Sequence, residues 1–260
     1  MNSLDFGFGA VEAQLWTLVF LMTRIGAALL AAPFFSAAAV PVQVRVGITG
    51  AIAVLVSAWL PIITPPALLS LAGVLAIASE ALIGLALGFV LQLSFAAPVI
   101  AAEQIGGAMG MSIASTADPV NGAHTPVLGQ YFTVMLTVIF LGLGAHLVWL
   151  RLLVESFTVF PPGGAWFGVA QIERLVGFGS EMFIAAVAIA MPVTLVLLLV
   201  QLASGVLSRS APALNLFALG LPAGILAGLA ALIAVAPLNA DQLVVLSEEA
   251  VQQVGALLAR

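Results

Sequence analysis

The sequence predicts an all-α integral membrane protein, and its composition and hydropathy lead to that class. Of the 260 residues, 63% are hydrophobic and only 7% are charged, whereas soluble domains carry roughly 25% charged residues. Apolar runs of about 20 residues, each enough to cross about 30 Å of hydrocarbon, recur along the chain. No stretch between them is long enough for a soluble domain with an active site. We therefore expect one domain, residues 1–260, with about six hydrophobic segments.

The composition also excludes several kinds of chemistry and partner. The chain has no cysteine, which excludes disulfides, cysteine-ligated metals and cysteine nucleophiles. Its net charge of −5 is spread thinly and includes no basic run, so membrane lipid is an expected partner and nucleic acid is not. The first residues carry Asp5 and Glu12 but no basic residue, unlike the positive start of a cleaved signal peptide. We expect the first span to be retained.

The first half of the chain contains three hydrophobic segments. The first covers about residues 14–32 and ends at Pro33, as expected for a proline beyond the last turn of a helix. The second covers about residues 46–63. The third covers about residues 67–102 and would measure roughly 54 Å as one helix. A helix of that length must tilt, bend near Pro98 or extend beyond the bilayer.

The second half begins with another block too long for one straight crossing, about residues 127–160, which ends at the Pro-Pro-Gly-Gly sequence of residues 161–164. A short amphipathic piece at residues 166–179 follows. The fifth and sixth segments cover about residues 182–207 and 214–235. The tail, residues 239–260, predicts an amphipathic helix whose apolar residues recur at helical spacing. These residues are Leu243, Val244, Leu246, Ala250, Val251, Val254, Leu257 and Leu258.

Residues 102–128 are unusual for a loop between apolar blocks, because they are rich in glycine and methionine rather than in Lys, Glu and Ser. The residues that carry the argument are Gly106, Gly107, Met109, Gly110, Met111, Asp118 and Pro119. Glycine allows unusual backbone angles, methionine deforms to seal irregular gaps, and Asp-Pro starts a turn. Irregular backbone at membrane depth needs protein or a water-filled cavity around it. The stretch predicts a compliant constriction, with an ordinary surface loop as the alternative.

Six ionisable residues lie in or beside apolar blocks, where a central charge costs about 2.5–3.5 kcal/mol on insertion scales. They are Arg24, Glu80, Glu103, His146, Arg151 and Glu155. Arg24 can pair with Glu80 or Glu103, and Arg151 with Glu155 one turn further along its helix. We interpret them as structural ion pairs, with a proton relay and contacts to another subunit as alternatives. His146 is interpreted as a hydrogen-bonded packing residue, with a proton switch as the alternative.

Small residues repeat at a spacing that lets helices in lipid approach closely. They are Gly84 with Gly88, Gly106 with Gly110, and the series Gly220, Gly224 and Gly228. We interpret them as packing positions within the chain, with a subunit interface as the alternative. Catalytic motifs are missing from the sequence, and two isolated histidines do not make a metal site. We therefore expect no enzyme activity, cofactor or metal.

Several short motifs follow one another in an order that identifies a family. They are Met22-Thr23-Arg24-Ile25-Gly26 with Ala32-Pro33-Phe34-Phe35, Glu80 with Gly84 and Gly88, the stretch from Glu103 to Leu128, Gly144 with His146, and Ala211-Pro212-Ala213-Leu214-Asn215. Together they resemble the FliR/SctT family, which includes the flagellar biosynthetic protein FliR. Each motif alone is loose, but the resemblance covers nearly the whole chain.

This resemblance implies a non-enzymatic subunit of the type III export gate, in the bacterial inner membrane at the flagellar basal body. Its partners would be FliP-like and FliQ-like subunits around a pore, an FlhB-like subunit at the entrance, and unfolded export substrates. The resemblance also implies that the over-long helical segments are arranged as bent hairpins. The stretch that matches residues 106–126 plugs the pore in that family. Because this chain lacks the phenylalanine that relatives often carry before Asp-Pro, the seal would rest on Met109, Met111 and Ile113.

Two other functions remain open at this stage. A small-molecule or ion transporter would use the Arg, Glu and His residues in the apolar blocks. Such transporters usually contain inverted repeats with interrupted helices at matching positions, and the sequence shows no convincing repeat. A structural scaffold without a conduit is the third possibility.

Overall fold

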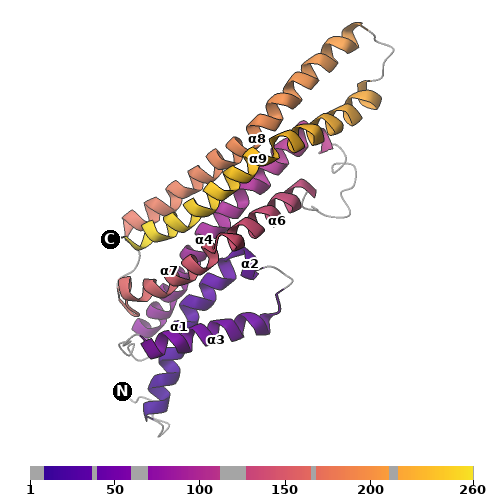
Figure 1. Cartoon of the computed structure of the whole chain (residues 1–260). Coiled ribbons are helices and arrows are strands. Elements are labelled where there is room, and N and C mark those ends of the chain that lie inside the picture. Colours follow the sequence, from indigo (N-terminus) through magenta and orange to yellow (C-terminus); the bar gives the residue numbers. More distant parts are fainter. Residues whose placement is uncertain are drawn as a thin grey trace. The chain divides into compact units, whose positions relative to one another are not determined.

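The computed structural model describes residues 9–36, 40–59, 70–111, 127–164, 168–210 and 216–259, and the regular elements in these ranges are all helices (Figure 1). In chain order they are α1 (Gly9–Ala31), α2 (Pro33–Ser36), α3 (Val42–Trp59), α4 (Leu71–Ala108), α6 (Val127–Gly142), α7 (Ala145–Val159), α8 (Val169–Ser210) and α9 (Leu216–Leu258). Five of them are long and apolar enough to cross a membrane, or six if α6 and α7, which are bent by 70° relative to each other, count together as one span. The predicted all-α membrane class is confirmed.

Prolines set the boundaries of the first helices. Pro33 is the first residue of α2, a position where its missing N–H is harmless. The carbonyl of Pro41 accepts hydrogen bonds from the backbone N–H groups of Val44 and Arg45, at 3.1 and 3.3 Å. Helix α3 therefore begins four residues earlier than the predicted start at residue 46, and residues 60–63 of that segment lie outside the described ranges.

Three helices are far longer than a simple crossing requires. Helix α4 has 38 residues, α8 has 42 and α9 has 43. Each continues through prolines, at positions 98, 192, 222 and 237. An interior proline removes a hydrogen bond and costs about 3 kcal/mol in a soluble helix, but helices in membranes tolerate it because neighbouring groups satisfy the backbone. The long third segment is therefore one helix.

Two predicted boundaries are wrong. Residues 166–179 do not form a separate piece, because from Val169 they are the first turns of α8. The tail at 239–260 is the continuation of α9, since Pro237 does not end that helix. The block at 127–160, predicted to be too long for one straight crossing, is two helices bent by 70°. Gly144 adopts a left-handed φ of 70°, which favours glycine, and its carbonyl accepts the backbone N–H of Leu147 at 2.9 Å to begin α7.

The predicted apolar face of the tail is buried. Leu243, Leu246, Ala250, Val254, Leu257 and Leu258 are buried, and Val244 and Val251 are half-buried. Arg174 of α8 donates hydrogen bonds to the backbone carbonyls of Ala256 and Ala259. The Ala256 carbonyl belongs to the last turn of α9, where such groups have no partner inside the helix, and Ala259 follows directly after it. The start of α8 is thereby tied to the end of α9.

The chain forms two compact units, each built from separate stretches. Unit 1 comprises Met1–Leu93, Gly144–Phe178 and Glu249–Arg260, and unit 2 comprises Ser94–Leu143 and Gly179–Glu248. Helices α4, α8 and α9 each run from one unit into the other. Neither unit is therefore one continuous stretch of sequence. Within unit 1, α1 packs against α2 and α3.

Much of the apolar surface of the spanning helices is exposed. Only 17% of the residues in the spanning windows of α3 and α9 are buried, against 56% in α4. Trp59 of α3 is 81% exposed and Ile233 of α9 is 77% exposed. Soluble monomers rarely expose contiguous apolar surface of this extent. These faces fit contact with lipid or with other membrane proteins.

Candidate functional site

Two buried charges of unit 1 form an ion pair. Arg24 of α1 and Glu80 of α4 are both 0% exposed. Arg24 Nε donates to Glu80 Oε2 at 2.7 Å, and Arg24 Nη2 donates to Glu80 Oε1 at 3.0 Å. Such two-point pairing fixes geometry as well as adding energy. Of the two carboxylates available to Arg24 in the sequence, the structure pairs it with Glu80, whereas Glu103 is exposed on α4.

The end of α7 supplies the remaining acceptors for Arg24. Arg24 Nη1 donates to the carbonyl and hydroxyl oxygens of Ser156, at 2.8 and 3.2 Å, and Nη2 donates to the carbonyl of Phe160 at 2.8 Å. With the two bonds to Glu80, all five N–H donors of the guanidinium have acceptors. The guanidinium carbon also lies 4.2 Å from the centre of the Phe157 ring, a cation–π contact. Arg24, Glu80, Ser156 and Phe160 are called the charge cluster below.

The turn after α7 also contacts the charge cluster. Gly164 N–H donates to the Pro161 carbonyl at 2.9 Å, and Gly163 has a φ of 73°. Pro162 and Gly163 thus occupy the positions that proline and glycine favour in a type II turn. The backbone N–H of Gly163 hydrogen bonds to Glu80. The Pro-Pro-Gly-Gly sequence therefore ends a helix and also supplies a donor to the buried carboxylate.

Two glycines bring α1 and α4 into backbone contact. A Cβ added at Gly84 would collide with the carbonyl oxygen of Arg24, and one added at Gly88 would collide with that of Ala28 and lie 2.6 Å from Ala31 Cβ. Only glycine permits so close an approach. Gly84, which touches the Arg24 backbone, lies one helical turn after Glu80 on α4. This contact therefore brings Arg24 beside Glu80. Gly84 and Gly88 thus pack within the chain.

Trp149 fixes α7 to its neighbours in unit 1. Its Nε1 donates to the carbonyl of Leu87 at 3.1 Å, and the side chain is fully buried. Its ring lies near Phe34 and Phe35 of α2, with centroids 6.2 and 6.5 Å away. Sequence reasoning missed Trp149 and Ser156. The available signal was a tryptophan inside an apolar block, because its N–H needs a partner when buried.

The predicted loop at 102–128 is wrong at both ends, because residues 102–108 belong to α4 and residues 127–128 to α6. In unit 2, just after α4, Met109 packs against α9. Its side chain is 2% exposed, and a Cβ added at Gly228 would lie 2.6 Å from Met109 Cε and Cγ. A Cβ at Gly224, one turn earlier, would lie 3.2 Å from the Met109 carbonyl oxygen. The absence of side chains at both glycines makes room for Met109. Met109, Gly224 and Gly228 are called the loop root.

The end of α4 at the loop root has a second attachment. Gln201 of α8 donates from Nε2 to the carbonyl of Ala108 at 2.8 Å. Gly110 has a φ of 82°, and its N–H donates to the Gly107 carbonyl at 3.0 Å. A left-handed glycine just after the last turn is a frequent end to a helix. The first residues of the loop are therefore fixed by α8 and α9, and no feature of the sequence pointed to Gln201.

The structure changes the roles assigned to several loop residues. Gly106 and Gly107 lie within the last turns of α4, so the predicted unusual backbone is wrong for them and holds only for Gly110. Met109 is buried in its own chain, which makes it an anchor rather than an available sealing surface, whereas Met111 is half-exposed. Ile113, Asp118 and Pro119 lie outside the described residues.

The other predicted buried charges are not buried within this chain. Glu103, Arg151 and Glu155 are exposed, because each lies on the face of its helix opposite the buried one. Among the described residues no ion pair joins Arg151 to Glu155, so the predicted pair is absent. His146 is half-buried and its Nδ1 has no hydrogen-bond partner, contrary to the predicted packing role. Gly220 is half-exposed on α9.

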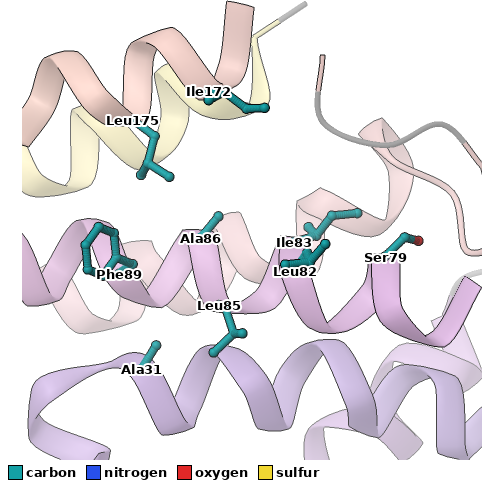
Figure 2. Close-up of a pocket in the computed structure, with 9 residues that line it drawn as sticks. All are labelled: Ala31, Ser79, Leu82, Ile83, Leu85, Ala86, Phe89, Ile172 and Leu175. Atoms are coloured by element: carbon teal, nitrogen blue, oxygen red, sulfur yellow. The ribbon is translucent and has the colours of Figure 1, made fainter. Parts of the chain in front are cut away.

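An apolar cavity of 580 Å³ lies in unit 1, between α4, the end of α1 and the first turns of α8 (Figure 2). It is lined by Ala31, Ser79, Leu82, Ile83, Leu85, Ala86, Phe89, Ile172 and Leu175. The hydroxyl of Ser79 donates to the carbonyl of Ala76 at 3.0 Å. The lining therefore lacks the convergent polar groups that orient a polar ligand.

Comparisons with known proteins reveal the family. Residues 15–250 match the family described as bacterial export proteins, family 1. The chain belongs to this family. The flagellar biosynthetic protein FliR of Escherichia coli (strain K12) is 34% identical over 219 residues, which are 84% of each chain. FliR of Bacillus subtilis (strain 168) is 34% identical over 226 residues, 85% of this chain and 84% of that protein.

A third relative is not named as a FliR protein. The surface presentation of antigens protein SpaR of Shigella flexneri is 33% identical over 142 residues, 55% of each chain. The predicted FliR/SctT family is confirmed by these matches. The chain is a membrane-embedded component of a type III secretion export apparatus.

Proposed function

We propose that this chain is a non-enzymatic subunit of the flagellar type III export gate, which it helps to form and to close. The observation that carries this proposal is the match of residues 15–250 to an export family, in a chain whose spanning helices α3 and α9 have only 17% of their window residues buried. Such helices fit assembly with FliP-like and FliQ-like membrane subunits around a pore. An FlhB-like subunit would stand at the entrance, and unfolded flagellar substrates would pass through.

The extent of the similarity to known relatives favours the flagellar export apparatus over another type III system. The FliR proteins of Escherichia coli and Bacillus subtilis align over 84% of their length, whereas SpaR aligns over 55%. The site of action is then the bacterial inner membrane at the flagellar basal body. Energy for export comes from partner subunits and the proton-motive force.

The two parts of the chain described above take different roles in this proposal. The charge cluster holds α1, α4 and α7 as a rigid frame, because its charges and donors satisfy one another. The loop at 102–128 closes the pore. Met109 anchors its start, Met111 and Ile113 seal, and Asp118-Pro119 turns the chain back towards α6.

The test is ion leakage through the assembled gate. Met109→Ala combined with Met111→Ala removes both the anchor and part of the seal. Gates that contain this double variant should pass ions or a small dye across the membrane, whereas the unaltered gate should not. Met191→Ala is the matched control, because Met191 lies 51% exposed on α8. A double variant that assembles normally and does not leak would refute the closing role.

A solute transporter is the competing function, and the cavity of unit 1 does not favour it. A transport site for a polar solute needs convergent polar groups, and the cavity is lined by apolar side chains and one hydroxyl that already donates within its own helix. The deciding measurement uses the purified chain alone in liposomes. Coupled solute flux there would support the transporter function over an export subunit.

A further inference from the structure

The chain passes between its two compact units four times. It does so at residues 93–94 in α4, 143–144 between α6 and α7, 178–179 in α8 and 248–249 in α9. The first three of these passages coincide with places where the backbone bends more easily than a regular helix does. Each of the three has its own chemical cause.

In α8 the cause is a pair of glycines inside a continuous helix. Gly177 and Gly179 flank Phe178, the last residue of that helix in unit 1. A Cβ added at either glycine would meet nothing within 4 Å, so close packing does not require glycine there. Glycine inside a helix costs about 0.8–1 kcal/mol relative to alanine, and helices kink at pairs of such small residues. The pair makes α8 easiest to bend where it passes between the units.

Between α6 and α7 the cause is a break in the helix. The two helices are bent by 70° relative to each other. Gly142 ends α6, and Gly144, with a φ of 70°, directly precedes α7. A Cβ added at either position would meet nothing within 4 Å. Both residues therefore have room for other backbone angles, which glycine adopts readily.

In α4 the cause is Pro98, which interrupts the hydrogen bonds of the helix. Because Pro98 has no N–H, it cannot donate the helical hydrogen bond to the carbonyl of Ser94, four residues earlier, and its ring crowds that carbonyl. Ser94 is the first residue of α4 in unit 2, so the weakened turn begins at the passage. Helix α9 has neither glycine nor proline at residues 248–249. It passes near its end, and helices curve gently without such residues.

We infer that residues 94–98, 142–144 and 177–179 form a hinge on which one unit moves relative to the other. These three segments are called the hinge points. In a motion of this kind a few residues absorb the change in backbone angles. Each unit keeps its internal packing while the hinge points bend.

The contacts that fix each unit lie on one side of the hinge points. All members of the charge cluster belong to unit 1, and so do both partners of the hydrogen bonds that Trp149 and Arg174 donate. The loop root belongs to unit 2, as do both partners of the hydrogen bond that Gln201 donates. Bending at the hinge points therefore breaks none of these contacts.

The proposed function gives the hinge a use. Movement of unit 2 carries the loop root with it and leaves the charge cluster of unit 1 undisturbed. The start of the loop after α4 then shifts without loss of the buried ion pair. This use rests on the proposed function, whereas the hinge itself is a property of the chain.

The experiment measures distances between two spin labels on the full chain, purified with the subunits that stay bound to it. The chain has no cysteine, so labels attach to it only at introduced cysteines. Val134→Cys on α6 and Glu155→Cys on α7 place one label in each unit, at exposed positions. Val54→Cys on α3 with Glu155→Cys places both labels in unit 1.

The widths of the two distance distributions decide the inference. For a hinge, the pair across the units should give a distribution at least about twofold broader than the pair within unit 1. Equal widths would refute the hinge. This comparison needs no change at the hinge points themselves.

A pair of variants tests whether the glycines of α8 belong to the hinge. Gly177→Ala combined with Gly179→Ala should narrow the distribution across the units towards the width within unit 1, because alanine restricts the backbone more than glycine does. The matched control is Gly47→Ala combined with Gly50→Ala. Both lie in α3 within unit 1, where an added Cβ meets nothing within 4 Å. An unchanged width in the α8 variant, or equal narrowing by the control, would overturn the inference.

The hinge and the proposed function fail in different ways. If the unaltered chain retains no gate subunit, the proposed function fails, and the two label pairs still decide the hinge. If the chain retains gate subunits and the two widths are equal, only the hinge is refuted.

Discussion

The charge cluster and the loop root hold helices together by different chemistry. The charge cluster joins α1, α4 and α7 through a buried guanidinium whose five donors are all used. The loop root joins α4 to α9 through the Met109 side chain against Gly228 and the Met109 backbone near Gly224, and a hydrogen bond from Gln201 also ties α4 to α8. The first arrangement has one acceptable geometry, whereas the second can deform, because a methionine side chain is unbranched and has several rotatable bonds.

This difference indicates which part of the chain is a frame and which part can move. Breaking a buried ion pair leaves an uncompensated charge, which is strongly unfavourable. Shifting a methionine over glycine exchanges one apolar contact for another and costs far less. The gate role proposed above would need both properties, because the walls of a gate must keep their positions while its closing segment gives way to a substrate.

The largest predicted effect is at the charge cluster. Arg24→Ala leaves the Glu80 carboxylate buried without its cation, and should lower the free energy of unfolding by about 3–5 kcal/mol. Chemical or thermal unfolding of the purified chain in detergent measures this. Arg151→Ala, which removes an exposed arginine from the same unit, should change stability little. Equal stability of the two variants would show that the charge cluster does not hold the frame.

The next effect is at the contact between α1 and α4. Gly88→Ala places a methyl group against backbone atoms of α1 that cannot move aside, and should cost about 1–3 kcal/mol. The control is Gly50→Ala on α3, where an added Cβ meets nothing within 4 Å. Alanine should be neutral there or stabilise the helix by up to about 1 kcal/mol. The difference between the two unfolding free energies is the quantity to measure.

A smaller effect is expected from the same change at the loop root. Gly228→Ala places its methyl group against the flexible end of Met109 rather than against backbone, so the expected loss is about 1 kcal/mol. The displaced methionine should make the loop easier to cleave by protease under native conditions. Unchanged cleavage would argue that Met109 does not anchor the loop.

The smallest effect is expected at the amide that ties α8 to α4. Gln201→Ala removes one hydrogen bond to the Ala108 carbonyl and should lower stability by about 0.5–1.5 kcal/mol. Amide hydrogen exchange in the last turn of α4 should rise at the same time. If Gln201→Ala instead raised amide exchange throughout both units, Gln201 would stabilise the whole chain, as the charge cluster does, rather than only the end of α4.

The sequence was sufficient for the features that depend on hydropathy and on local residue chemistry. Long apolar blocks predicted the spanning helices, and the position of Pro33 predicted the end of α1. The choice of partner for Arg24 could not be made from the sequence. It is set by Gly84 and Gly88, which bring α1 against α4 near Glu80, whereas Glu103 lies 23 residues further along the same helix, roughly 34 Å away.

Other features were beyond the sequence because they depend on which surfaces meet. Gly144 lies between two helices, as the residue just before α7, whereas Gly177 and Gly179 lie within one, and the neighbouring residues do not distinguish these cases. Met109 was predicted to seal, because methionine is deformable. Its anchoring role depends on the two glycines of α9 that face it more than a hundred residues later in the chain.

The measurement that tests the central claim most directly is the composition of the complex around this chain. A tagged chain is purified in mild detergent from cells that make the flagellar apparatus, and the proteins recovered with it are identified and weighed by mass spectrometry. The account predicts one assembly that contains FliP-like and FliQ-like helical membrane subunits. A chain that purifies alone, or with lipid only, would contradict it.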